Sequence, residues 1–270
     1  MMQTELSAHV KNIKKNILRV SFECGKNVHL GGAFSMVELL SVLYLQVLRY
    51  RPDQPEWEDR DRFILSKGHC AIALYAVLAE CGVIGIKELD TFMQNDSALV
   101  VHPVMSLPLG LESSNGSLGQ GLSLAVGLAQ AAKLKGKTHH IYTLVGNGEC
   151  NEGAVWEAAM LAASLKLDNL TVLVDDNRFQ SDGESSRVLD MGDAAAKWTS
   201  FGFDVRETDG HDCAAIYQAF QGGMSGKPRV ILGRTVKGHG ISFMENRGEW
   251  HHNRLTKQLY EQALAEVEGT

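Results

Sequence analysis

Two segments in the middle of the chain carry residue types that can bind a diphosphate and a metal ion. The first is Gly146-Asn147-Gly148, and Asn177 follows Asn147 by 30 residues. Glycines let backbone N–H groups approach an anion, and the positive end of a helix beginning near Gly153 would strengthen that attraction. Side-chain oxygens beside such a cradle are what Mg²⁺ with a diphosphate requires. The alternative is two ordinary turns, because Gly and Asn are common turn formers.

Histidine is the second residue type here that could do chemistry. Of ten histidines, four lie in segments marked by glycine or proline: His29, His69, His102 and His251. An imidazole can hold or move a proton near neutral pH, so these residues could serve acid–base catalysis. For any single histidine, a structural role or solvent exposure is the simpler interpretation.

Three other glycine-containing segments have simpler explanations. The segment 116–121 opens a nearly apolar helix, where glycines can serve close helix packing. A turn between a strand and a helix explains Asp209-Gly210-His211-Asp212. Lys237, in a loop after a strand, could face a bound ligand, but a solvated side chain is the simpler expectation.

An alternation of strands and helices would have to position these residues. Apolar periodicity predicts helices over residues 5–24, 35–48, 70–81, 119–135, 153–166, 193–200 and 213–222. Short β-rich runs predict strands over 62–65, 141–145, 170–174, 203–207 and 230–235. This order predicts an α/β fold with a mainly parallel sheet and helices on both faces. Ligands of such sheets bind at the carboxyl ends of strands, so the loops after Leu65, Val145 and Val174 should form the site.

The composition fits one globular domain over residues 1–270, with 44% hydrophobic and 21% charged residues. A net charge of −6 without a basic run argues against nucleic-acid binding. No apolar run is long enough to span a membrane, and no secretory leader pattern is present. The five cysteines are widely spaced, without a CxxC pair, which favours reduced thiols and a cytoplasmic protein.

The segment from Gly146 to Gly183 resembles the thiamine-diphosphate motif of transketolases, especially the N-terminal subunits of transketolases divided between two chains. That motif begins with Gly-Asp-Gly and closes with an Asn one strand–helix–strand repeat later. The resemblance implies that the side chains of Asn147 and Asn177 and the backbone carbonyl of Phe179 bind the metal ion. The family has Asp where this chain has Asn147.

The resemblance also implies roles for other residues. It implies cofactor contacts for His69, Gly116, Leu118, Gly146, Gly148, Glu149, Asn177 and His251. It implies catalytic roles for His29, His102, His69, His251 and Glu152, with His29 and His102 on the sugar. Glu152 and Glu157 match an acidic pair that links cofactor sites across the dimer. Val101 and His252 stand where the family has Gly.

The resemblance covers residues from about 10 to 255, and all of it maps to the family's diphosphate-binding domain. The family's glutamate that activates the cofactor lies in a second, pyrimidine-binding domain, for which no residues remain. The resemblance therefore implies a C-terminal partner subunit, in a heterotetramer with two copies of each chain. With thiamine diphosphate and Mg²⁺ (or another divalent cation), the assembly would transfer a two-carbon ketol unit from a ketose or its phosphate to an aldose.

Three alternatives stay open at this point. One is a subunit of another thiamine-diphosphate enzyme, of the 2-oxo acid dehydrogenase type, although the GSLGQG and WEA segments and the four histidines speak against it. Another is a non-catalytic homologue that acts as a binding or regulatory subunit, an interpretation that Asn147 supports. A flavodoxin-like domain without thiamine diphosphate is the third.

Overall fold

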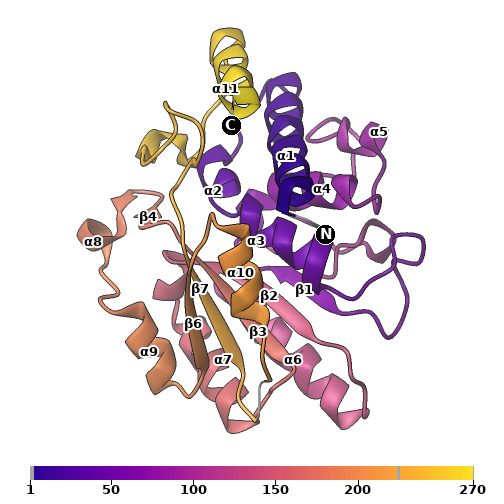
Figure 1. Ribbon diagram of the computed structural model, residues 1–270, viewed down its shortest axis with the longest axis vertical. Helices are drawn as coiled ribbons and strands as arrows, with labels where there is room; N and C mark the ends of the chain where they lie inside the picture. The colour runs from indigo at the N-terminus through magenta and orange to yellow at the C-terminus, as the bar shows by residue number, and fades with distance from the viewer. Residues whose placement is uncertain (1–2, 224–225, 270) are drawn as a thin grey trace.

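A five-stranded parallel sheet runs through the centre of the protein (Figure 1). The computed structural model describes residues 3–223 and 226–269. The strand order is β1-β2-β3-β7-β6, and every neighbouring pair is parallel. The strands are β1 (Arg62–Leu65), β2 (Ile141–Gly146), β3 (Leu170–Asp176), β6 (Asp204–Asp209) and β7 (Arg229–Arg234). The predicted mainly parallel sheet is confirmed, with strands close to the predicted bounds.

Helices cover both faces of the sheet, as predicted (Figure 1). The core on one face of the sheet contains residues of α1, α3, α4 and α10, and the core on the other face contains residues of α6, α7 and α9. Successive strand residues point to opposite faces, so Leu144 joins the first layer and Val145 the second. The helices are α1 (Gln3–Glu23), α2 (Leu30–Phe34), α3 (Val37–Val42), α4 (Ala71–Glu80), α5 (Ile86–Leu89), α6 (Gln120–Leu134), α7 (Gly153–Ser164), α8 (Ser185–Val188), α9 (Ala194–Ser200), α10 (Cys213–Phe220) and α11 (Lys257–Gly269).

The helix predicted over 35–48 is found as α3 and a π-helical turn that continues it, Leu43–Val47. The short helix α2, which was not predicted, precedes it. The break between α2 and α3 falls at Ser35, whose hydroxyl lies 2.6 Å from a carboxylate oxygen of the buried Asp175. A contact to a residue so distant in sequence leaves no local signal.

The C-terminal helix α11 was not predicted. It packs against α1 and buries Ala263 and Val267, so its apolar residues recur at helical spacing. Among the described helices, none is both long and apolar enough to cross a bilayer. None of the five cysteines is paired in a disulfide in the structure.

Candidate active site

A cavity of about 640 Å³ lies at the carboxyl end of the sheet, beside the loops that follow β1, β2 and β3. The predicted site residues that line it are His29, His69, Gly116, Leu118, Gly146, Asn147, Gly148, Glu149, Glu152, Asn177, Phe179 and His251. His102 lies outside this lining, with its ring centroid 6.4 Å from that of His29. A neighbouring cavity of about 680 Å³ shares Asn147 and Phe179. The predicted site residues thus converge in space, although they come from distant parts of the sequence.

Four histidine rings surround His29. Its ring centroid lies 5.0 Å from that of His69, 5.3 Å from that of His251 and 4.4 Å from that of His252. The fourth ring, that of His102, has its centroid 6.4 Å from that of His29. Nδ1 of His29 is buried and has no hydrogen-bond partner within the described residues. A buried polar atom without a partner is uncommon in a folded protein and marks a position where a ligand can bind.

The imidazoles of this cluster are poor bases in the folded chain. Burial, followed by the charges of neighbouring histidines and lysines, lowers the pKa of His29 to about 3 and that of His251 to about 4. Burial and Lys67 lower the pKa of His69 to about 2. The three rings are therefore neutral at pH 7, and each offers one N–H donor and one lone pair.

The lowered pKa of His69 predicts acid sensitivity of the free chain. Below pH 6.5 the unfolded chain takes up a proton at this position that the folded chain does not. Stability should therefore fall with falling pH, by about 1.4 kcal/mol per unit from this group. His69→Gln cannot be protonated, so urea unfolding between pH 7.5 and 5 should show a shallower decline. An unchanged decline would mean that His69 is not the buried neutral group described here.

Two lysines that lie against the cavity were missed as site residues. Lys67 Nζ lies 2.5 Å from Oδ2 of Asp175, and both side chains are buried. Burial alone would lower the pKa of Lys67, but Asp175 outweighs it and raises the pKa. The pair is therefore charged, and Ser35 and Thr235 also hydrogen-bond to Asp175.

Lys237 corrects the expectation of a solvated side chain. Only 1% of it is exposed, and it lines the cavity. Its Nζ donates to the carbonyl of Gln180 over 3.2 Å and lies 3.4 Å from Nδ1 of His251. Burial lowers the pKa of Lys237 to about 8. An anion in the cavity would supply the negative partner that this buried amine favours.

Glu149 lines the cavity but bonds to the protein. Its carboxylate accepts hydrogen bonds from the Ser66 hydroxyl, from the Gly119 N–H over 2.8 Å and from the Gly146 N–H over 3.0 Å. It thereby ties together the loops after β1, before α6 and after β2. The Gly146 N–H is therefore engaged within the protein and is not free to donate to a diphosphate.

Asn147 and Asn177 follow the ends of the adjacent strands β2 and β3, as predicted. Nδ2 of Asn147 donates to Oγ of Ser185 over 2.6 Å, which leaves Oδ1 to accept or coordinate. Nδ2 of Asn177 donates to Asp175 over 3.1 Å, and Oδ1 accepts the Phe179 N–H over 3.0 Å, keeping one lone pair. Both amides can therefore present an oxygen, the ligand type that a hard divalent cation favours.

Comparisons with known proteins place the chain in a family. The fold and the cavity define an α/β protein with a candidate ligand site at the carboxyl edge of a parallel sheet. The family described as "Transketolase, thiamine diphosphate binding domain" matches residues 16–265. The chain belongs to the transketolase family. It is a transferase subunit, and its cofactors are thiamine diphosphate and a divalent cation.

Two relatives are similar over nearly their whole length, and each is named as one subunit of a transketolase. The chain is 38% identical over 269 residues to a subunit of the apulose-4-phosphate transketolase of Phocaeicola vulgatus, covering 98% of this chain and 95% of the relative. It is 38% identical over 268 residues to a 6-deoxy-6-sulfo-D-fructose transketolase subunit of a Clostridium species, covering 98% and 97%. The transketolase structure from Campylobacter jejuni matches with a TM-score of 0.90 and 29% identity, over 99% of this chain and 43% of that one. The chain thus spans less than half of that transketolase.

The cavity fits these cofactors. Neutral donors from the histidines and the amine of Lys237 suit a diphosphate, and the amide oxygens of Asn147 and Asn177 suit its metal ion. Neither asparagine is anionic, and the Glu149 carboxylate is engaged within the protein. That geometry argues against Glu149 supplying the charge that Asn147 lacks.

Proposed function

We propose that this chain, as a single domain over residues 1–270, is the N-terminal subunit of a two-chain transketolase. The assembly transfers a two-carbon ketol unit from a ketose or its phosphate to an aldose. The observation that carries this proposal is the single cavity that joins a histidine cluster to two amide oxygens at the sheet edge. The unpaired cysteines fit a cytoplasmic location, where thiols stay reduced.

The residues divide into two groups by position. Thiamine diphosphate, when bound, supplies the carbon nucleophile that attacks the ketose carbonyl. His69, His251 and Lys237 hold the diphosphate, and Asn147, Asn177 and the Phe179 carbonyl hold Mg²⁺. The backbone at Gly116 and Leu118 contacts the cofactor. His29 and His102 hydrogen-bond to the sugar and hold or pass its protons.

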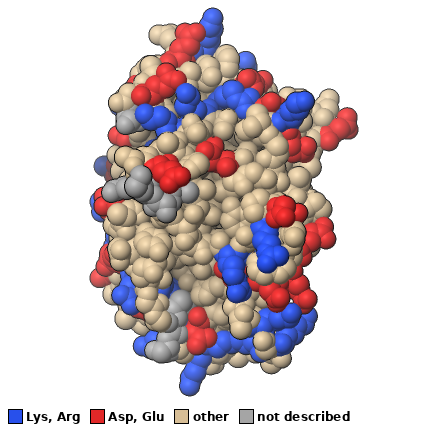
Figure 2. Space-filling view, turned by 45° about the vertical axis from the view of Figure 1, so that its right-hand side comes forward, with Lys and Arg blue, Asp and Glu red and all other residues tan. Residues whose placement is uncertain are grey.

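An uncharged surface beside the site suits a partner chain. Between Asp96 and Lys133 the only charged residue is Glu112, and it is paired with Arg60. Figure 2, with the side that carries α4 and α6 turned forward, shows a broad area without charged side chains. Large apolar side chains are exposed on this segment and on α7, namely Val104, Met105, Leu124, Met160 and Leu161. Exposed apolar patches of this kind mark protein interfaces.

The acidic pair fits an interface as well. Glu152 precedes α7 and Glu157 lies on it, and both are exposed. Glu152 also lines the cavity, so a partner packed there would meet the site directly. We propose that this partner is a C-terminal subunit with the pyrimidine-binding domain, in an assembly of two copies of each chain.

The chain made alone should therefore be inactive and should self-associate through its uncharged surface. Mixing it with the partner subunit is expected to restore ketol transfer and to give a defined heteromer. Light scattering and a coupled ketol-transfer assay would measure both effects. Robust turnover by this chain alone, free of host enzyme, would contradict the two-chain proposal.

The relatives suggest a class of substrate. Their names give a sugar phosphate in one case and a sulfonated sugar in the other, so both names refer to sugars with a terminal anion. We propose that the donor is a ketose with a terminal anionic group and that the partner subunit supplies most of the contacts to that group. The family match and the relatives named as transketolase subunits favour this activity over a non-catalytic binding subunit. Calorimetry with thiamine diphosphate and Mg²⁺ on the assembled protein would test cofactor binding.

A further inference from the structure

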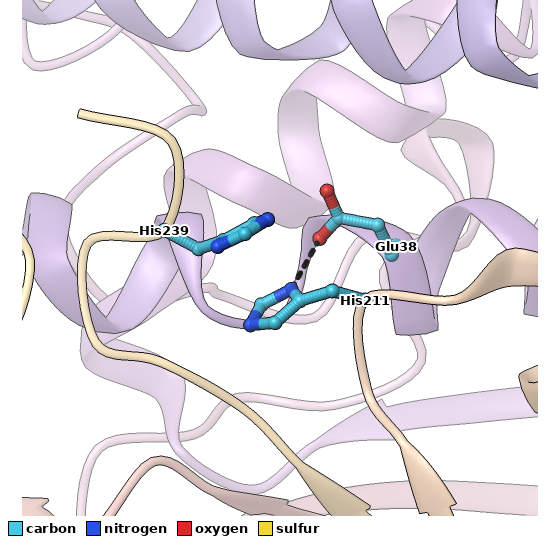
Figure 3. A group of neighbouring side chains, drawn as sticks. All are labelled: Glu38, His211 and His239. Carbon is cyan, nitrogen blue, oxygen red and sulfur yellow. Dashed lines mark hydrogen bonds and ion pairs between the residues drawn. The ribbon is translucent and has the colours of Figure 1, made fainter.

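Glu38, His211 and His239 form a cluster of potential metal ligands away from the cofactor cavity (Figure 3). One ligand atom of each lies within 4.8 Å of the others. Glu38 lies on α3, and the two histidines lie in the loops after β6 and β7. Oε2 of Glu38 and Nδ1 of His211 are 3.2 Å apart, a separation that suits a hydrogen bond or two ligands of one tetrahedral metal ion.

The proton on His211 decides between these possibilities. The backbone N–H of Val236 donates to Nε2 of His211 over 2.8 Å, so Nε2 must carry the lone pair. In a neutral imidazole the proton then sits on Nδ1 and points at Glu38. A metal ion on Nδ1 would move this proton to Nε2, against the Val236 N–H. Ligating histidines show the opposite arrangement, with the second nitrogen donating to an acceptor.

Glu38 already has a cationic partner. Nζ of Lys14 lies 2.7 Å from its Oε1, and both side chains are largely buried. Burial alone would raise the pKa of Glu38, but His211 and Lys14 outweigh it and hold the pKa at about 2. The carboxylate is therefore ionised and accepts from both neighbours. His239 stacks on His211 with ring centroids 3.5 Å apart. The polar atoms of Glu38 and His211 thus have partners within the protein without a metal ion.

The backbone that His211 holds leads directly to the cofactor cavity. Val236 is followed by Lys237, which lines the cavity. The next N–H, of Gly238, donates to the carbonyl of Gly31 over 2.9 Å, and Gly31 lies in α2 close to His29. A Cβ atom added at Gly31 would come within 2.8 Å of the Trp250 carbonyl and 3.0 Å of the Lys237 side chain, so Gly31 packs closely against both. A shift of the Val236 backbone would therefore also move Lys237, which lines the cavity.

We infer that His211 is a positioning residue for the cofactor site, an inference that rests on the proposed function. His211 links α3 to the loop after β7 by donating to Glu38 and accepting from Val236, and it thereby fixes Lys237. Lys237 has no carboxylate partner within ion-pair distance in the described part of the chain, so its placement depends on its backbone. The buried ionic link from Lys14 through Glu38 anchors His211 in turn.

Two amide variants separate the two hydrogen bonds of His211. In His211→Asn the amide nitrogen takes the place of Nδ1, which keeps the bond to Glu38 and leaves the Val236 N–H without an acceptor. In His211→Gln the amide oxygen reaches the place of Nε2 and keeps the bond from Val236. Both variants lose the ring stack, so each controls for the other.

In the assembly with the partner subunit, His211→Asn should raise the Kd for thiamine diphosphate roughly tenfold and accelerate exchange of the Val236 amide hydrogen. His211→Gln should remain close to wild type in both measurements. Equal effects of the two variants, or none, would overturn the inference. Failure of the wild-type assembly to bind the cofactor would instead overturn the proposed function, and Val236 exchange would still test the His211 contact.

A measurement on the wild-type protein covers the case in which His211→Asn does not fold. The ¹⁵N shifts of the His211 ring should show an unprotonated Nε2 and a protonated Nδ1, and added Zn²⁺ should leave them unchanged. A protonated Nε2, or ring signals that move with Zn²⁺, would overturn the inference and favour a metal site.

Discussion

His29→Ala is expected to lower turnover of the assembled enzyme roughly 100- to 1,000-fold, the range for loss of one hydrogen-bond donor to the reacting oxygen, with little change in cofactor affinity. His29 is the centre of the histidine cluster, and its Nδ1 is buried without a partner in the described residues. Its ring is neutral in the free chain and can donate to or accept from a sugar hydroxyl or carbonyl. Steady-state kinetics and calorimetry with thiamine diphosphate would measure the two effects.

His69→Ala is expected to show the opposite pattern, with a larger effect on cofactor affinity than on turnover. His69 lies beside Lys67 on the diphosphate side of the proposed site, so its loss should mainly raise the cofactor Kd. His9→Ala, on α1 and in contact with Glu80 outside the cavity, controls for loss of a histidine elsewhere in the chain. Equal loss of cofactor affinity in His29→Ala and His69→Ala would show that the proposed division of roles is wrong.

Asn147→Asp is expected to tighten binding of Mg²⁺ together with thiamine diphosphate by roughly 10- to 100-fold. The wild-type ligand set contains two neutral amides, and the nearby carboxylate of Glu149 is held by Ser66, Gly119 and Gly146. An Asp at this position adds a negative charge to a hard-cation site. It can also accept from the Ser185 hydroxyl, which now accepts from Asn147.

The matched control is Asn151→Asp. Asn151 lines the same cavity, and its amide donates to the Leu189 carbonyl, so this variant adds the same charge without placing it on the metal ion. Metal titrations of cofactor binding, with the partner present, compare the three proteins. If Asn147→Asp binds no more tightly than wild type, or if Asn151→Asp gains as much, the assignment of Asn147 as a ligand fails.

The sheet and the position of the site could be predicted because their signals are local. Buried parallel strands are short continuous apolar runs, and the helices between them repeat apolar residues at helical spacing. Each run and each turn is visible within a few residues of sequence. The rule that ligands bind at the carboxyl ends of parallel strands then places Asn147 and Asn177 at one edge, where the structure has them.

The partners of the polar groups could not be predicted in the same way. Lys237 was expected in solvent, yet it is buried against the Gln180 carbonyl. Asp175 accepts hydrogen bonds from Ser35 and Lys67, which lie more than 100 residues away in sequence.

The sequence by itself therefore determined the fold class, the edge of the sheet that carries the candidate site and the residue types present there. Only the tertiary structure decided which donors are free for a ligand and which are already engaged. Glu149 and the Gly146 N–H bond to each other, whereas His29 keeps a buried nitrogen without a partner in the described residues. The physical reason is that secondary structure follows from neighbouring residues, whereas hydrogen bonds between side chains depend on segments that only folding brings together.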